Sequence, residues 1–289
     1  MRSLSKILLP VDFSERSLGA ARYARLMACR FGSELTLLHV LTPPHYEFGA
    51  LEIGGSMLTE LYTSRSAQVE KELDGFLQAE LSGINVRRLV LEGDPARRIV
   101  EFAHQEQMGL IIMPTHGYGH FRRFILGSIT AKVLHDADCP VWTGVHMEEA
   151  PPADAPVLRE ILCAIDLGPQ SGKTLEWAAA IQKGFGARLT VIHVPTCSAD
   201  SATHPAPDHR AEMEARVRSD IAALQEQAGT QAEVVIEPGD PPKVICGAAA
   251  RLRAGLLVIG RGSAGGVFGR LRTNAYAIIR QSPCAVASV

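Results

Sequence analysis

The sequence has little that is typical of an extracellular, membrane-bound or nucleic-acid-binding protein. Its six cysteines include no Cys-x-x-Cys pair, which favours buried thiols in a reducing compartment over a disulfide framework. No apolar run approaches the roughly 18 residues that a membrane-spanning helix needs. The 29 basic residues nearly balance the 31 acidic ones, so no charged surface for nucleic acid or an anionic membrane is indicated. We therefore expect a cytoplasmic protein without a membrane span or a nucleic-acid partner.

What the sequence does contain is an internal repeat. Residues 7–40 align with residues 161–194, and eleven of these 34 positions are identical. Unrelated sequences of average composition would share about two. The triplet Gly-Asp-Pro that begins at Gly93 recurs at Gly239. The chain is therefore two copies of one domain. Its length of 289 residues agrees with this, because a single domain usually has about 150 residues.

The repeat also predicts where the domains begin and end. We expect the first domain over residues 1–147 and the second over residues 157–289. The stretch between them, residues 148–156, is polar and rich in proline, which is typical of a linker.

Each copy alternates short apolar runs with amphipathic segments, which predicts an α/β fold. The expected strands of the first copy are residues 6–11, 35–40, 86–91, 110–113 and 140–145. Those of the second copy are residues 161–165, 189–194, 232–237, 256–259 and 285–289. We expect a long charged helix before the third strand, which ends near Leu81 in the first copy and near Gln227 in the second. This alternation indicates a doubly wound parallel sheet in each copy.

An acidic residue ends the first strand of each copy, Asp12 in the first and Asp166 in the second. Doubly wound sheets bind ligands at the carboxyl ends of their strands, where a carboxylate can accept hydrogen bonds from a ribose hydroxyl or a base amine. The same residues can instead form a helix cap or an Asx-turn. Asp94 and Asp240 are expected to cap helices, because proline follows each at the first helical position.

A glycine-rich loop follows the fourth strand of the first copy and ends at Gly127 and Ser128. Gly127 has no Cβ, so a phosphate can approach its backbone closely. The Ser128 hydroxyl and the first-turn amides of the apolar helix that follows can then bind the anion. The alternative is an ordinary turn with a capping serine.

Together these motifs resemble the universal stress protein family. The resemblance rests on Asp-Phe-Ser after the first strand, Leu-Leu-His-Val in the second, the segment Gly-x9-Gly-Ser, and Cys-Pro-Val before the last. It covers nearly the whole chain as a tandem pair. It implies two Rossmann-like domains of the HUP type and a role in stress response. It also implies an intramolecular pseudo-dimer, in which the last strands of the two copies pair.

The family signature, Gly-x2-Gly-x9-Gly-(Ser/Thr), belongs to members that bind ATP. In the first copy it falls on Pro114, Gly117, Gly127 and Ser128, so three of its four positions match. Pro114 replaces the first glycine and removes a backbone N–H that could meet a phosphate. Family members contact the adenosine at the positions of Asp12 and Val40. The resemblance therefore implies an ATP site formed by Asp12, Val40, Pro114, Gly117, Gly127, Ser128 and Ile129.

The second copy departs further from the signature. Arg272 and Thr273 stand where the first copy has Gly127 and Ser128. A long side chain there occupies the place where backbone should meet phosphate. We expect this copy, despite Asp166, to be degenerate or to take another ligand.

Three other patterns carry less weight. Residues 260–265 match Gly-x-Gly-x-x-Gly but follow the fourth strand, too late for a dinucleotide fold. Residues 168–174 resemble a phosphate-binding P-loop with one residue missing between its glycines. His116 and His120 lack further metal ligands, so no metal site is expected. No nucleophile elbow or catalytic triad is present, and no catalytic residue is predicted.

Three functions remain open from the sequence. The first is a regulatory module that binds ATP in the first copy and controls a protein partner. The second is a slow ATP-hydrolysing enzyme. The third is a scaffold that binds an apolar ligand or a protein rather than a nucleotide. Association of two tandem chains into a homodimer also stays open.

Overall fold

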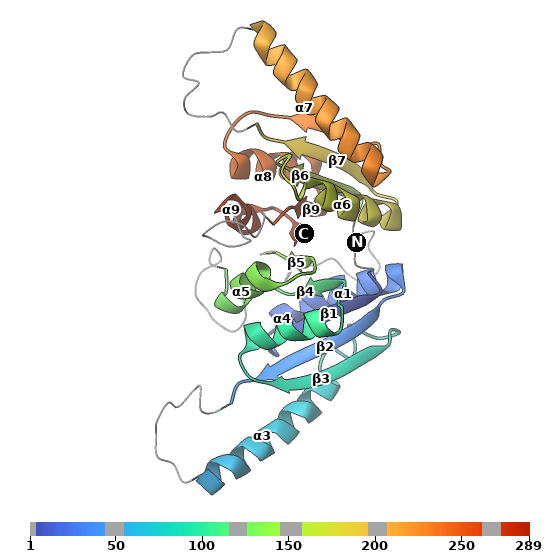
Figure 1. Ribbon diagram of the computed structural model, residues 1–289. Coiled ribbons are helices and arrows are strands. Elements are labelled where there is room, and N and C mark those ends of the chain that lie inside the picture. Colours follow the sequence, from blue (N-terminus) through green and yellow to red (C-terminus); the bar gives the residue numbers. More distant parts are fainter. Residues whose placement is uncertain (1–3, 44–54, 116–125, 145–157, 196–206, 262–272) are drawn as a thin grey trace. The chain divides into compact units, whose positions relative to one another are not determined.

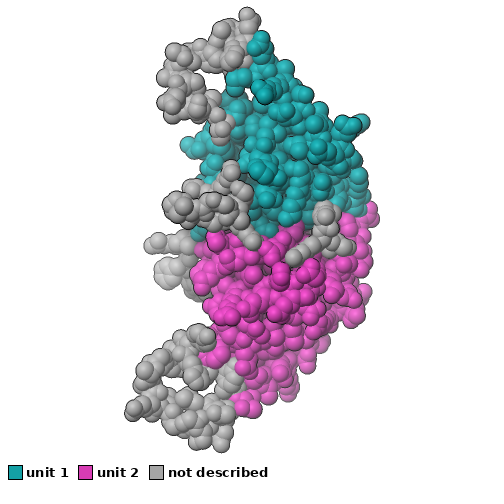
Figure 2. Space-filling model, viewed as in Figure 1, with its two compact units in different colours: residues 1, 156–289 teal, residues 2–155 magenta. Residues whose placement is uncertain are grey.

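The computed structural model describes two compact units. The described residues are 4–43, 55–115, 126–144, 158–195, 207–261 and 273–289. Residues 2–155 form the N-terminal unit and residues 156–289 form the C-terminal unit (Figure 2). The expected linker, residues 148–156, lies outside the described residues.

The N-terminal unit is an α/β domain built on parallel strands. Its elements are β1 (Lys6–Val11), α1 (Arg16–Phe31), β2 (Glu34–Leu41), α3 (Gly55–Gly75), β3 (Val86–Glu92), α4 (Pro95–Gln105), β4 (Leu110–Ile112), α5 (Ser128–Asp136) and β5 (Val141–Thr143) (Figure 1). The strand order is β3-β2-β1-β4-β5, and each neighbouring pair is parallel. The predicted doubly wound sheet is confirmed.

The C-terminal unit repeats this plan. Its elements are β6 (Glu160–Ile165), α6 (Ser171–Phe185), β7 (Arg188–His193), α7 (Pro207–Ala228), β8 (Glu233–Ile236), α8 (Pro241–Leu252), β9 (Leu256–Ile259), α9 (Thr273–Gln281) and β10 (Ala285–Ser288) (Figure 1). The strands run in the order β8-β7-β6-β9-β10, again with parallel neighbours.

Each unit has its core on its own central strand. In β1, Ile7, Leu8 and Leu9 are fully buried. Continuous apolar runs of this kind are typical of parallel strands covered on both faces. Each core also holds one tryptophan, Trp142 in the N-terminal unit and Trp177 in the C-terminal unit. The two units therefore bury separate sets of large side chains.

The strand order places a crevice at the same point of each sheet. β1 lies between β2 and β4, so the chain leaves β1 towards one side and later returns on the other. Doubly wound sheets bind ligands outside the carboxyl ends of the strands at such a reversal. In the C-terminal unit the reversal lies between β6 and β9.

One predicted boundary is wrong. We expected the helix before the third strand to reach Leu81, but α3 ends at Gly75 and Leu77 has a left-handed φ of 56°. Arg88 of β3 satisfies the open carbonyls at this helix end. Its Nε donates to the Leu73 carbonyl over 2.9 Å, and its Nη2 donates to the Phe76 carbonyl over 3.0 Å. A contact with a distant strand, absent from the local pattern, therefore ends the helix.

Candidate functional site

A cavity of about 120 Å³ lies at the carboxyl ends of β1, β2 and β4 in the N-terminal unit. Residues near the starts of α4 and α5 complete its lining. Four of the seven expected site residues line this cavity: Asp12, Val40, Pro114 and Ile129. They come from four separate segments of the chain, and the fold brings them together.

The other three expected residues do not line the cavity: Gly127 and Ser128 lie beside it, and Gly117 lies outside the described residues. Gly127 is the N-cap residue of α5 and Ser128 is its first helical residue, so the alternative of a capping serine is wrong. The Gly127 N–H donates to the Thr115 carbonyl over 2.8 Å. Ser128 is exposed. The first-turn N–H groups of an α-helix have no intrahelical acceptor, so this end of α5 favours an anion.

Asp12 holds the turn after β1 while its carboxylate borders the cavity. Its Oδ1 accepts hydrogen bonds from the Ser14 N–H at 3.1 Å, the Ser14 hydroxyl at 2.6 Å and the Ser17 hydroxyl at 3.4 Å. The next residue, Phe13, has a left-handed φ of 62°. The Asx-turn interpretation is therefore confirmed for this oxygen. A left-handed non-glycine residue is strained, and the turn fixes the carboxylate in place.

His39 also lines the cavity, and its ring is tied to the neighbouring strand. Its Nδ1 lies 2.9 Å from the Val11 carbonyl, and since a carbonyl only accepts, Nδ1 carries the hydrogen. The Phe13 ring packs 4.5 Å from the imidazole ring, centroid to centroid. Burial lowers the pKa of His39 below its usual value of 6.5, although Asp12 acts in the opposite direction. These contacts give His39 a structural role in holding the ends of β1 and β2 together.

Pro114 is held by a residue that the sequence analysis did not single out. The Thr130 hydroxyl donates to the Pro114 carbonyl over 3.0 Å and so joins the first turn of α5 to the end of β4. Thr130 is buried and lines the cavity. Because Pro114 and Thr130 lie 16 positions apart, no local sequence signal pointed to this contact.

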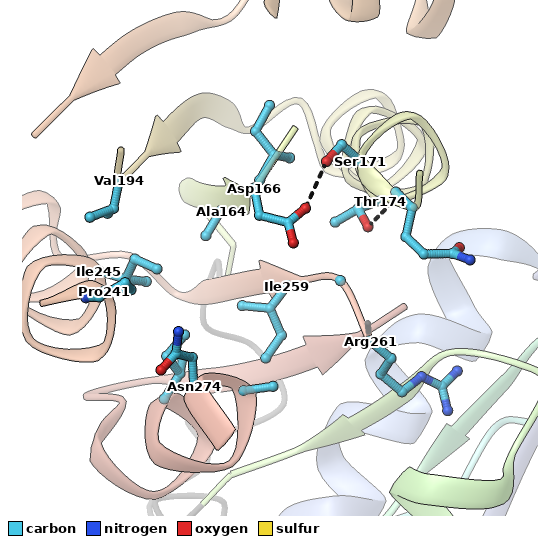
Figure 3. A pocket seen from close by; sticks show the side chains of 15 residues that line it. Ala164, Asp166, Ser171, Thr174, Val194, Pro241, Ile245, Ile259, Arg261 and Asn274 are labelled. Atoms are coloured by element: carbon cyan, nitrogen blue, oxygen red, sulfur yellow. Dashed lines mark hydrogen bonds between the residues drawn. The ribbon is translucent and has the colours of Figure 1, made fainter. Parts of the chain in front are cut away.

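The C-terminal unit has a related cavity of about 140 Å³, at the carboxyl ends of β6 and β9 (Figure 3). Asp166 lies there as Asp12 does in the N-terminal unit. Its Oδ1 accepts from the Gly168 N–H at 2.9 Å and from the Ser171 hydroxyl at 3.2 Å. Leu167, which follows, has a left-handed φ of 58°. The turn after the first strand is therefore built in the same way in both units.

The rest of that cavity lining differs. Gly260, Asn274 and Ala275 stand where the N-terminal unit has Pro114, Ile129 and Thr130. In the view of Figure 3, Asp166 lies above Ile259 and Asn274 lies below it. Arg272 lies outside the described residues, and Thr273 begins α9.

Within the described ranges, no group of three or more His, Cys, Asp or Glu side chains is arranged to hold a metal ion. His116 and His120 lie outside these ranges. Among the same residues, none of the helices combines the length and apolar character needed to cross a bilayer.

Comparison with known proteins gives one consistent match. The model of the universal stress protein family matches residues 4–143 and 158–289. A universal stress protein of Methanocaldococcus jannaschii is 33% identical over 136 residues, which cover 47% of this chain and 79% of that protein. One of Thermus aquaticus is 34% identical over 140 residues, 47% of this chain and 94% of that protein.

A solved structure resembles the whole chain. The crystal structure of a universal stress protein from Archaeoglobus fulgidus DSM 4304 superposes with a TM-score of 0.68 and 24% identity. The match covers 99% of this chain and 96% of that one. At this identity the likeness supports the fold alone.

Proposed function

This chain belongs to the universal stress protein family, and we propose that its N-terminal unit is a regulatory ATP-binding module of the cytoplasm. One observation carries the proposal. Asp12, Val40, Pro114 and Ile129 are far apart in the sequence, yet they line a single cavity at the point where the strand order reverses. This is the place where doubly wound sheets bind nucleotides.

The chemistry of the cavity fits the adenosine part of ATP, and its size is that of a site for one aromatic ring. A cavity of about 150 Å³ holds a benzene ring, and the described part of this one is of similar size, about 120 Å³. Val40 supplies an apolar wall, and the Ile129 side chain, 40% exposed, adds apolar surface. The Asp12 carboxylate would accept hydrogen bonds from ribose hydroxyls or a base amine.

The phosphates would lie beyond this cavity, at the start of α5. Ser128 and the first-turn amides of this helix would bind them, and the helix dipole favours their negative charge. Gly127 leaves room for close approach, and Gly117 of the same signature belongs to the proposed site. Pro114 contributes no N–H, so phosphate binding would rest on the α5 side.

Regulation rather than rapid catalysis is the expected consequence of ATP binding. The sequence offers no general base beside the phosphates except His116 and His120. Slow hydrolysis is thus the enzyme alternative, and a partner protein or a second tandem chain would read out the occupied state.

An apolar ligand is the second candidate function. Several described residues that line the cavity are apolar, among them Val11, Leu38 and Met113. A ligand with one apolar ring would be buried there without any use of Ser128.

The decisive experiment identifies the ligand and then removes its site. The protein is purified without added nucleotide and denatured, and the released small molecules are identified by mass spectrometry. ATP is then titrated calorimetrically against the wild type, Gly127→Arg and the control Gly75→Arg. The control places the same side chain at the end of α3, where a Cβ meets no atom within 4 Å.

We expect adenine nucleotide in the released fraction and ATP binding by the wild type and Gly75→Arg. For Gly127→Arg we expect affinity to fall by at least about 10-fold, because a side chain fills the phosphate position. Equal affinity of all three proteins would place ATP elsewhere. An apolar molecule in the released fraction would support the second candidate.

A further inference from the structure

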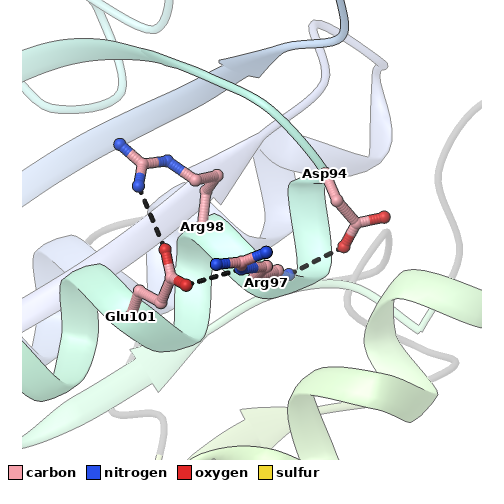
Figure 4. Close-up of polar contacts among 4 residues, drawn as sticks. All are labelled: Asp94, Arg97, Arg98 and Glu101. Atoms are coloured by element: carbon pink, nitrogen blue, oxygen red, sulfur yellow. Dashed lines mark hydrogen bonds and ion pairs between the residues drawn. The ribbon is translucent and has the colours of Figure 1, made fainter. Parts of the chain in front are cut away.

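Basic side chains gather at the start of α4, close to the proposed site, but two of them already share one carboxylate as a partner. Arg97 Nε lies 2.6 Å from Glu101 Oε1, and Arg98 Nη1 lies 3.0 Å from Glu101 Oε2 (Figure 4). These hydrogen bonds lower the pKa of Glu101, so the carboxylate stays charged between its two arginines. Neither arginine is therefore the first choice to meet an incoming anion.

Lys132 of α5 is held much more loosely. Its Nζ lies 4.0 Å from Asp94 Oδ2, and its side chain is 63% exposed. Asp94 is committed elsewhere through its other oxygen, which caps α4 by accepting from the Arg97 N–H at 2.9 Å. Exposed ion pairs at such a distance contribute little, so Lys132 can leave Asp94 at small cost.

The helix geometry places Lys132 over the proposed phosphate position. Lys132 follows Ser128 by four residues, so the two share one face of α5 and lie about 6 Å apart along its axis. Side chains in an α-helix lean towards its N-terminus. The lysine chain therefore extends back over the turn that begins with Ser128.

We propose that Lys132 binds the terminal phosphates of ATP in the N-terminal unit, and that Asp94 holds this lysine when no nucleotide is bound. This inference rests on the proposed function. The ammonium group would add positive charge at the start of α5, through charge-assisted hydrogen bonds to phosphate oxygens. Asp94 competes for the same cation and so weakens nucleotide binding.

The C-terminal unit lacks this arrangement. Ala277 stands at the position of Lys132. In the described part of the chain, the Asp240 side chain makes no capping hydrogen bond, unlike Asp94. The lysine is therefore specific to the unit that keeps Gly127 and Ser128.

The test compares ligands that differ only in their phosphates. Affinities for ATP and adenosine are measured by calorimetry for the wild type, Lys132→Gln, Asp94→Asn and the double variant. Asparagine caps helices as well as aspartate, so Asp94→Asn removes the charge and keeps the cap. Lys71→Gln removes an exposed lysine of α3 and serves as the control.

We expect Lys132→Gln to weaken ATP by about 10-fold and to leave adenosine unchanged. Asp94→Asn should strengthen ATP by about 2- to 3-fold, because the competing carboxylate is gone. That gain should vanish in the double variant, and Lys71→Gln should behave as the wild type.

Two results would overturn the role of Lys132 and leave the proposed function intact. One is an unchanged ATP affinity of Lys132→Gln. The other is an equal loss of ATP and adenosine, which would mean that the substitution acts through the fold. If the wild type binds no ATP at all, the proposed function fails and this inference fails with it.

Discussion

The two units share one fold and differ in the residues that line the cavity at the reversal of their strand order. Each turns after its first strand through an aspartate and a left-handed residue, and each has a cavity at the reversal of its strand order. The N-terminal unit has Gly127 and Ser128 but Pro114, whereas the C-terminal unit has Gly260 but Arg272. Each unit thus keeps a different part of the family signature.

The difference is one of packing as well as of ligand chemistry. A Cβ on Gly260 would lie 3.0 Å from Thr174 Oγ1, so a larger residue there would require the threonine to shift. In the N-terminal unit the residue equivalent to Thr174 is Ala20, which is fully buried, and Pro114 takes the place of Gly260. A larger residue in one position accompanies a smaller one in the other. In each unit, the size of the residue at this signature position is thus matched to that of the residue on the first helix.

The largest expected effect concerns the turn before α4 and α8. Gly93 and Gly239 have φ values of 135° and 144°, which an alanine adopts only with strain. An added Cβ would lie 2.8 Å from Val244 Cγ2 in the C-terminal unit but 3.1 Å from the flexible Arg98 Cγ in the N-terminal unit. We expect Gly239→Ala to cost about 3 kcal/mol and Gly93→Ala about 2 kcal/mol.

The two tryptophans make this comparison measurable in the full chain. Trp177→Phe leaves Trp142 as the reporter of the N-terminal unit, and Trp142→Phe leaves Trp177 for the C-terminal unit. Unfolding by urea, followed by fluorescence in these backgrounds, gives the free energy of each unit. A larger loss for Gly93→Ala than for Gly239→Ala would contradict the role of Val244.

A smaller effect tests the coupling of Gly260 with Thr174. We expect Gly260→Ala to destabilise the C-terminal unit by about 1–2 kcal/mol, because the new methyl group crowds Thr174. Thr174→Ala should remove most of that cost in the double variant, so that the two changes are not additive. Denaturation followed through Trp177 measures both. Strict additivity would show that the two positions are independent.

The helix caps provide a third comparison. Asp94→Ala should destabilise the N-terminal unit by about 1 kcal/mol, because the Arg97 N–H loses its acceptor. Asp240→Ala should cost only a few tenths of that, since the described contacts of Asp240 include no capping bond. Thermal unfolding of both variants measures the two losses of stability. If the losses were equal, Asp240 would also cap its helix in solution.

The smallest expected effect is on how the stability of the N-terminal unit depends on pH. Burial lowers the pKa of His39, so the unfolded chain binds a proton at a higher pH than the folded one. The free energy of unfolding is therefore unaffected by His39 above its usual pKa of 6.5. As the pH falls from there through the lowered folded-state pKa, protonation of the unfolded chain reduces this free energy. We expect the urea midpoint of the N-terminal unit to drop less between pH 7.5 and 5.5 in His39→Gln than in the wild type. An identical drop of the urea midpoint in both proteins would exclude His39 as a source of the pH dependence.

Much of the fold follows from the sequence because its signals are local. The apolar runs predicted the strands to within a few residues, and Gly32 and Gly186 end α1 and α6 with left-handed φ values of 63°. The end of α3 was not predictable in this way. Its last carbonyls are satisfied by Arg88, which follows more than ten residues later in another strand.

The site was accessible from the sequence only through the repeat and the family resemblance. They brought Asp12, Val40, Pro114 and Ile129 to attention, and these residues line one cavity. Thr130 and Lys132 were missed. Their partners, Pro114 and Asp94, lie 16 and 38 positions away in the chain, and no local pattern encodes such a meeting.

The hydrogen bonds of Asp12 and Asp166 within their own turns bear on how loss of function is recognised in duplicated proteins. Replacing either aspartate would loosen the passage from the first strand to the first helix, whether or not any ligand is bound. Purifying selection on folding alone can thus preserve the acid after binding has decayed. The presence of Asp166 in the C-terminal unit is accounted for by its turn and is not by itself evidence of a ligand site there.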